Sequence, residues 1–259
     1  MRTDYRKQIL MLVLCVFFLC TPMSTSYALS SSPKKVAIII DDFGNNLKGS
    51  KAFFSIQAPL TVAIMPFLKT STEDAQKAHE AGFEVILHLP MEPVRGKKSW
   101  LGPGAITTDM TSEEIKNTLR KDLDSLPHVV GINNHMGSKA TADERVVKAI
   151  LEVLKERDLF IIDSLTSTHS KIEKLAKEMQ VPYKRRTLFL DNQNSKSAIS
   201  NQYQLLIKRT LNQGWGIAIG HVGHQGINTY EATTDVLTQF KKEQIELVHV
   251  SEIVSPSKH

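Results

Sequence analysis

Cysteine is almost absent from this chain of 259 residues: its two cysteines, Cys15 and Cys20, both lie within the first 20 positions. Residues 29–259 therefore contain no thiol, which excludes disulfide bridges and thiolate metal sites from them. Their stability must come from a hydrophobic core, and their number suits one large α/β domain.

A strong excess of charge of one sign is lacking as well. The formal net charge is +5, and it falls to +3 without residues 1–28, because 29 basic and 26 acidic residues then remain. So small an excess does not indicate a nucleic-acid partner.

Three common functional motifs are also missing. No GxGxxG or GxxxxGK[ST] string follows the first apolar run, so we expect no nucleotide site. No GxSxG string occurs, which argues against a serine hydrolase.

The pattern of residues 1–28 is typical of a secretory signal peptide. A basic start precedes the apolar stretch Ile9–Cys20, and Ser26-Tyr27-Ala28 supplies small residues for cleavage. Twelve apolar residues are few for a bilayer span, so we expect cleavage after Ala28 and no stable membrane span. The protein would then be secreted or extracytoplasmic, and a retained N-terminal anchor is the alternative. Residues 29–34 would form a linker, 35–254 the domain and 255–259 a tail.

From Val36 onward, short apolar runs alternate with amphipathic segments. The runs predict strands at Val36–Ile40, Leu60–Met65, Glu84–Leu89, Val129–Asn133, Leu159–Ile162, Thr187–Leu190, Gly216–Gly220 and Ile245–Val250. Alternation of this kind is typical of βαβ units and a parallel sheet. Seven or eight units favour an irregular parallel (β/α) barrel of seven to eight strands over an open doubly wound sheet.

The amphipathic segments predict the helices. Thr111 and Glu114 have the spacing of a capping box before an apolar-periodic segment that Pro127 ends. The four clearest helices are expected at Ile115–Leu126, Ala142–Arg157, Asn201–Gln213 and Thr229–Lys242. The longest non-helical segment is Met91–Met110, and long loops in compact domains tend to be functional.

Polar residues gather at the carboxyl ends of the predicted strands, where parallel folds build their sites. The first strand runs directly into the adjacent carboxylates of Asp41 and Asp42. The full set is Asp41, Asp42, His88, Glu92, Asn134, His135, Asp163, Asp191 and His221. Each residue alone has a simpler explanation, such as a helix cap for Asp163 or Asp191. Together they indicate a site, because the other ends of the strands show no comparable set.

The chemistry of this set is that of a metal-dependent hydrolase. Histidine and carboxylate ligands without cysteine suit Zn²⁺ or a similar divalent ion with one open position. Such an ion lowers the pKa of water to about 7, and a nearby carboxylate and histidine can then act as base and acid.

The strand-end strings resemble those of the divergent polysaccharide deacetylase family, over roughly Lys34 to Val254. The resemblance rests on Ile39-Ile40-Asp41-Asp42-Phe43-Gly44, His88-Leu89-Pro90-Met91-Glu92-Pro93, Gly131-Ile132-Asn133-Asn134-His135-Met136-Gly137-Ser138, Phe160-Ile161-Ile162-Asp163-Ser164 and Gly220-His221. It implies a deacetylase-type (β/α) barrel and a divalent metal, expected to be zinc. It also implies that Asp41 is the catalytic base, Asp42 and His88 are metal ligands, and His221 is the general acid.

The chain departs from the broader deacetylase pattern at two points. The second histidine of the His-x-x-x-His metal motif is replaced by Glu92, and the arginine-containing motif after the fourth strand by Asn133-Asn134-His135. We suggest His135 as the third metal ligand, with Glu92 as its rival. The further candidate site residues are Asn134, Asp163 and Asp191.

The leading hypothesis is a secreted, metal-dependent hydrolase that deacetylates a polysaccharide or a peptidoglycan-type glycan. A non-catalytic carbohydrate-binding or envelope protein on a deacetylase scaffold is the alternative, and a hydrolase of another bond is a third. Trp100, in the long loop, is a candidate for stacking on a sugar. The basic run Lys184-Arg185-Arg186 is expected to be a solvated turn at the end of the barrel opposite to the site.

Overall fold

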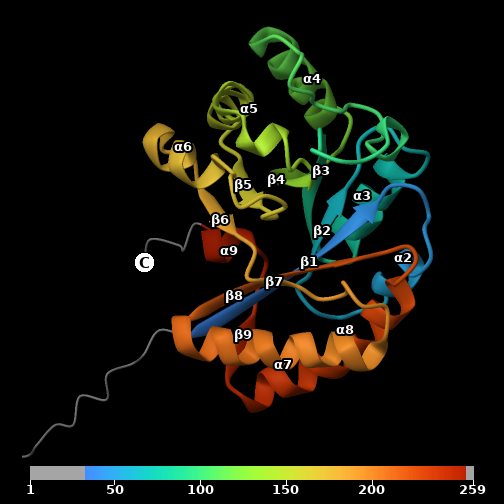
Figure 1. Ribbon diagram of the computed structural model, residues 1–259. Coiled ribbons are helices and arrows are strands. Elements are labelled where there is room, and N and C mark those ends of the chain that lie inside the picture. The colour runs from blue at the N-terminus through green and yellow to red at the C-terminus, as the bar shows by residue number, and fades with distance from the viewer. Residues whose placement is uncertain (1–32, 255–259) are drawn as a thin grey trace, which may run out of the picture. The chain divides into compact units, whose positions relative to one another are not determined.

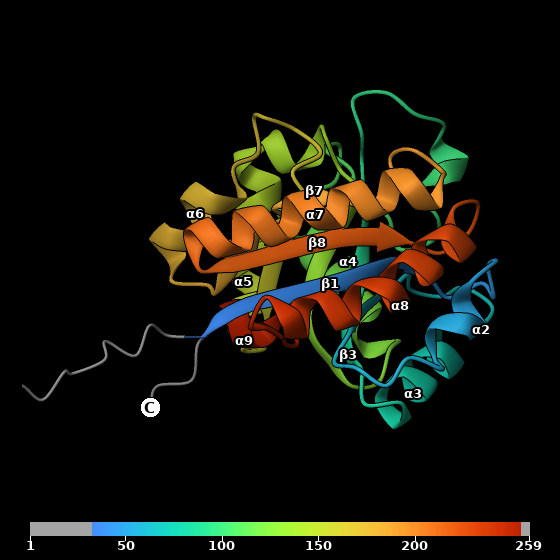
Figure 2. The same ribbon diagram turned by 90° about the horizontal axis from the view of Figure 1, so that it is seen from below.

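The computed structural model describes residues 33–254, which form a sheet of nine parallel strands surrounded by helices (Figures 1 and 2). The strands are β1 Lys34–Phe43, β2 Thr61–Ile64, β3 Glu84–Met91, β4 Val129–Met136, β5 Phe160–Asp163, β6 Tyr183–Arg185, β7 Leu188–Phe189, β8 Trp215–His221 and β9 Ile245–Leu247. The expected signal peptide, residues 1–28, and tail, residues 255–259, lie outside the described residues.

The strand order is β6-β5-β4-β3-β2-β1-β8-β7, with β9 paired to the start of β1. Every ladder is parallel, which confirms the irregular (β/α) barrel predicted from the sequence. The hydrogen-bonded path begins at β6 and ends at β7, and within residues 33–254 no ladder joins these two strands. The wall of the barrel is therefore split between two strands that are neighbours in the chain.

Alternation along the strands separates two apolar layers. In β1, Val36, Ile38 and Ile40 belong to the large cluster beneath the helices. Ala37 and Ile39 belong to a smaller cluster, together with inward-facing residues of the other strands. Because side chains of a strand point to alternate faces, each residue's position in the strand decides whether it faces the barrel interior or the helices.

The helices are α2 Ser50–Phe53, α3 Ser71–Glu80, α4 Ser112–Asp124, α5 Glu144–Glu156, α6 Ile172–Met179, α7 Lys196–Gln213, α8 Gly226–Lys242 and α9 Ser251–Val254. The capping box predicted at Thr111 is present before α4. Helix α7 lies against β8 (Figure 2), and Gly216 permits this close approach, since a Cβ there would meet Thr210 Oγ1 at 2.2 Å. No helix within residues 33–254 has the length and apolar character needed to cross a membrane.

Two strands run further than the sequence pattern indicates. β3 continues to Met91 and β4 to Met136, so His135 lies within a strand, as His88 does, instead of beyond its end. Their ladder holds His88 opposite Asn133 and Pro90 opposite His135. The polar residues at the ends of β3 and β4 are thereby fixed by main-chain hydrogen bonds, which position them more rigidly than a loop would.

Candidate functional site

The adjacent carboxylates of Asp41 and Asp42 reach the same histidine because β1 is irregular at this point. The register between β1 and β2 shifts between Ile40 and Phe43, and Asp42 has a left-handed φ of 70°. Simple alternation would point consecutive side chains to opposite faces, whereas a bulge re-aims one of them. As a result, Asp41 Oδ2 lies 3.7 Å and Asp42 Oδ1 lies 3.3 Å from Nε2 of His88.

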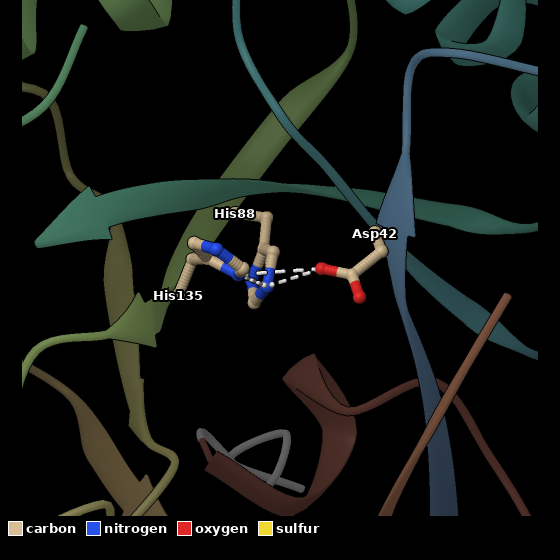
Figure 3. Close-up of side chains that lie close together, drawn as sticks. All are labelled: Asp42, His88 and His135. Carbon is tan, nitrogen blue, oxygen red and sulfur yellow. Dashed lines mark hydrogen bonds and ion pairs between the residues drawn. The ribbon is translucent and has the colours of Figure 1, made fainter. Parts of the chain in front are cut away.

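Asp42, His88 and His135 form a group whose ligand atoms all lie within 4.8 Å of one another (Figure 3). Oδ1 of Asp42 is 3.3 Å from His88 Nε2 and 3.3 Å from His135 Nδ1, and the two ring nitrogens are 3.0 Å apart. Tetrahedral zinc with bonds of about 2.0–2.1 Å separates its ligand atoms by about 3.3–3.4 Å. The three atoms are thus spaced as three corners of such a coordination shell.

The remaining nitrogen of each imidazole is held by a neighbouring oxygen. Nδ1 of His88 lies 2.7 Å from the side-chain oxygen of Asn133, and Nε2 of His135 lies 3.2 Å from the main-chain oxygen of Trp100. An oxygen of this kind accepts a hydrogen bond, so each of these nitrogens carries the proton and the other nitrogen has a free lone pair. Both lone pairs then face the carboxylate of Asp42, as they do in metal sites supported by a second layer of hydrogen bonds.

Asn133 joins the candidate metal ligand His88 to the candidate base Asp41. Its amide oxygen accepts from His88, and its amide nitrogen donates to Asp41 Oδ1 at 2.8 Å. All three side chains are buried. Burial raises the pKa of Asp41, although the charges of His88 and His221 and this hydrogen bond oppose the rise. Burial raises the pKa of Asp42, but in their protonated forms His135 and His88 donate to this carboxylate and hold its pKa well below the usual range.

His221 ends β8 in register with Asp41 of the neighbouring strand β1, on the side of β1 away from β3 and β4. Its Nδ1 is 2.8 Å from Asp191 Oδ1, while its main-chain N–H and the hydroxyl of Thr229 donate to Asp191 Oδ2. Burial lowers the pKa of His221, but the hydrogen bond to Asp191 and the charge of Asp41 outweigh burial and raise it to about 9. At neutral pH this imidazole is therefore protonated and can donate a proton.

The other candidate residues have different partners. Asn134 ties β4 to the loop after β5, because its side-chain oxygen accepts from Ser164 N–H. Asp163 accepts from the Leu165 N–H and the Ser170 hydroxyl, in a turn at the outer side of the sheet. The structure does not bring either residue into the cluster of Figure 3.

Glu92 and Trp100 both lie in the loop that follows β3. The carboxylate of Glu92 accepts from Thr108 and forms an ion pair with Lys139 Nζ at 2.7 Å, which holds its pKa at about 2. It is engaged in fixing the loop and does not join the three-residue group. The side chain of Trp100 is 58% exposed, while its main-chain oxygen contacts His135.

Two features were missed by the sequence analysis. Asn133 belongs to the Asn133-Asn134-His135 string, but no feature of that string indicates that it bridges His88 and Asp41. The expectation for the basic run is wrong: Lys184 and Arg185 form strand β6, which pairs with β5 so that Arg185 lies opposite Asp163 at the carboxyl end. Arg186 follows at this same end of the barrel, and it is half-buried.

A sequence profile of the divergent polysaccharide deacetylase family matches residues 38–254. An uncharacterized protein of Haemophilus influenzae is 33% identical over 201 residues, which make up 78% of this chain and 70% of that protein. The uncharacterized protein YibQ of Escherichia coli is 33% identical over 205 residues, 79% of this chain and 61% of its own length. The chain thus spans less than two thirds of the Escherichia coli protein.

Solved structures share the fold at low sequence identity. The uncharacterized protein ATU2773 of Agrobacterium tumefaciens superposes with a TM-score of 0.80 at 19% identity, over 87% of this chain and 91% of its own. The catalytic domain of a peptidoglycan N-acetylglucosamine deacetylase of Eubacterium rectale gives 0.52 at 11% identity, covering 92% and 97%. BA3943 of Bacillus anthracis, described as a CE4 family pseudoenzyme, gives 0.50 at 14% identity, covering 86% and 66%. Since the fold occurs in both an enzyme and a pseudoenzyme, activity has to be argued from the residues of the site.

Proposed function

Because the chain belongs to the divergent polysaccharide deacetylase family, we propose that it is a metal-dependent hydrolase that removes acetyl groups from a polysaccharide. The observation that carries this proposal is the combination of three converging ligand atoms with a buried carboxylate on one side and a protonated imidazole on the other. Metal-assisted acyl hydrolysis needs these three parts: a ligand set, a proton acceptor and a proton donor.

Asp42, His88 and His135 would hold the divalent ion, and their spacing and donor types favour zinc. Once bound, the ion would supply Lewis acidity, acidifying a water molecule and polarising the acetyl carbonyl. While both imidazoles are neutral and no cation is bound, their lone pairs and the Asp42 carboxylate repel one another at distances of 3.0–3.3 Å. This repulsion supports the assignment of the group as a ligand set.

Asp41 would accept the proton of the attacking water. Its Oδ1 is held by Asn133, while Oδ2 remains directed towards His88 and the ligand group. Burial raises the pKa of this carboxyl, which makes it a stronger base than an exposed aspartate. Asn133 keeps the base and the ligand His88 in one fixed relation, so it acts as a positioning residue.

His221 would donate a proton to the leaving nitrogen or oxygen of the sugar. Because Nδ1 of His221 is hydrogen-bonded to Asp191, the proton on Nε2 is the one that can be transferred. Asp191 is itself buried and fixed by Thr229 and by the main chain of His221, so the orientation of the imidazole is set before substrate arrives.

The rim around these residues supports a glycan as substrate. Apolar side chains are exposed in three consecutive loops at the carboxyl ends of β1, β2 and β3: Leu47, Phe67, Val94 and Trp100. Aromatic rings combine a large apolar face with a low conformational cost, which suits contact with sugar rings. We infer a polysaccharide or peptidoglycan-type partner, reached outside the cytoplasm after cleavage near Ala28. N-terminal sequencing of the exported protein tests that location.

Acetate release tests the proposed activity. The purified protein, loaded with Zn²⁺, is incubated with chitooligosaccharides and with acetylated xylan, and acetate is measured before and after chelation. Asp41→Asn should lower the rate roughly 10²–10⁴-fold, because general-base catalysis contributes about that factor. Asp124→Asn, at an exposed residue far along α4, is the matched control and should leave the rate unchanged.

Two outcomes would contradict the proposal. The first is metal binding without acetate release from any of these glycans; glycan binding in that case would favour the non-catalytic carbohydrate-binding alternative. The second is acetate release that persists at the original rate in Asp41→Asn, which would show that the proton is accepted elsewhere.

A further inference from the structure

A cavity of ≈ 470 Å³ lies at the split in the barrel wall, between β6 and β7. Its walls include residues of the β6–β7 connection, the last turns of α7 and the first residue of β8. The residues that matter for its chemistry are Arg185, Arg186, Arg209, Asn212, Gln213 and Trp215. None of the candidate metal ligands or catalytic residues lines it.

The charge of the cavity is strongly one-sided. Three arginines line it, and no acidic side chain is among its lining residues. Arg185 has only a distant ion pair, 3.8 Å from Glu173 of α6. Arg186 and Arg209 donate to main-chain oxygens, which leaves their positive charges unneutralised. A concentration of arginine without carboxylates creates a positive potential that attracts an anion.

Of the three arginines that line the cavity, Arg186 is the one whose side chain is held in place by its neighbours. Its Nε donates to the Ser164 oxygen at 2.8 Å, and its guanidinium carbon lies 3.7 Å from the ring centre of Phe189. Burial, together with the charge of Arg209, lowers the pKa of Arg186, although the charges of Asp163 and Asp41 oppose this. No acceptor for its Nη1 is found within residues 33–254, so a rigid guanidinium retains a free donor.

The same cavity carries the features of a sugar site. Trp215 supplies an indole ring with Lys184 Nζ 5.0 Å from its centre, and Asn212 supplies an amide that can bond to hydroxyl groups, while the amide nitrogen of Gln213 donates to the Trp215 main-chain oxygen. The volume is far larger than a bare oxyanion requires. The Phe189 ring contacts both Arg186, at 3.7 Å, and the imidazole of His221, with the ring centres 5.7 Å apart.

We propose that this cavity binds an acidic saccharide, with a carboxylate of the sugar held by Arg186 and Arg209 and the sugar ring against Trp215. The proposal rests on the proposed function in one respect, that the ligand is a carbohydrate. It adds that the glycan recognised by this protein carries uronic-acid or similar carboxylate groups, bound at a distance from the acetyl group that reacts.

Calorimetric titration with tetragalacturonate and with its fully methyl-esterified form tests the proposal, because the two probes share one sugar chain and esterification replaces each carboxylate by a neutral methyl ester. The acid should bind at least roughly tenfold more tightly than the ester, since charge-assisted hydrogen bonds are worth about that factor or more. Its affinity should also fall as salt is raised from 50 to 500 mM. Arg209→Gln should remove most of the difference between acid and ester. Arg186→Lys should weaken acid binding as well, because lysine lacks the planar fork.

Arg157→Gln serves as the control, since Arg157 is an exposed arginine that pairs with Asp124 on the α4–α5 side of the molecule and does not line the cavity. Equal binding of acid and ester, or an equal loss in Arg157→Gln, would overturn the proposal. Binding of inorganic phosphate without binding of tetragalacturonate would overturn the saccharide assignment. Charge-dependent binding without any acetate release would contradict the proposed hydrolysis only, so the two failures are distinguishable.

Discussion

Replacing Asp191 by Asn should move the pH at which His221 loses its proton. In the folded protein, burial lowers the pKa of His221, but the hydrogen bond to Asp191 and the charge of Asp41 raise it to about 9. Against an ordinary value of about 6.5, the difference corresponds to roughly 3 kcal/mol in favour of the protonated imidazole. At pH 7.5 the imidazole is then almost fully protonated, whereas an unperturbed one would be about nine-tenths neutral.

The variant removes one charge and keeps the shape. Asn at position 191 has a single acceptor oxygen, so it can accept either from Nδ1 of His221 or from the His221 main-chain N–H and the Thr229 hydroxyl, and no bond that remains is charge-assisted. Since such a bond contributes roughly 1.5–3 kcal/mol, the pKa of His221 should fall by about 1–2 units. If His221 is the general acid, the alkaline decline of kcat/KM should shift to lower pH by the same amount.

Two measurements check this expectation. The first is the pH profile of acetate release, and the second is an NMR titration of the His221 ring, which needs no turnover. Because the folded pKa is raised, His221 also stabilises the fold below about pH 6.5, and this contribution is lost as the pH rises through 9. Asp163→Asn alters another strand-end carboxylate and should leave both curves unchanged. A ring titration that stays in place in Asp191→Asn would refute the reasoning.

Three further predictions concern the fold, the ligand set and the bridge. Burial raises the pKa of Asp122 to about 8, so the protonated carboxyl stabilises the fold at low pH, and this stabilisation is lost as the pH rises from about 4 to 8. In urea unfolding, the free energy of unfolding of Asp122→Asn should gain roughly 3 kcal/mol on that of the wild type as the pH rises from 5 to 7. His135→Ala should weaken Zn²⁺ binding at least tenfold by calorimetry, whereas Glu92→Gln should leave it nearly unchanged, and the reverse order would contradict the ligand assignment. Asn133→Leu should lower kcat with little change in KM, and an unchanged kcat would show that the bridge is not needed.

Strand alternation explains how far the sequence could predict the site. In β3, β4 and β8 the inward-facing positions continue from apolar residues such as Ile86 and Ile219 to His88, Asn133, His135 and His221 at the carboxyl end. Asn134 and Asp163 take the outward-facing positions, because each lies two residues after an isoleucine of the outer layer, Ile132 or Ile161. Strand alternation thus separates the site residues of β3, β4 and β8 from the two that bond locally, but it would place Asp42 of β1 on the outer face.

Other parts of the site depend on tertiary structure alone. Glu92 follows His88 by four residues, so strand alternation alone would point it inward as well. It lies just beyond the end of β3, however, and there Thr108 and Lys139 determine the direction of its carboxylate. The short strand β6 was not predicted because Tyr183–Arg185 has no apolar run. It forms through its ladder to β5, and this pairing carries Arg186 to the rim of the barrel. Neither contact has a signal in the local sequence.

The pair Asp41-Asp42 shows why two adjacent carboxylates can have different roles. A regular strand would bury one and direct the other towards the helices, where a carboxylate in the outer apolar layer would be costly. The left-handed φ of Asp42, at a register shift of β1, directs its carboxylate back to the histidines. Aspartate tolerates this conformation better than most residues, so the residue type that suits the metal also suits the bend. Asp42→Ala would remove the ligand and disfavour the bend together, whereas Asp42→Asn should keep the bend and weaken only the metal site. A difference in thermal stability between these two variants therefore measures the strain held at the end of β1.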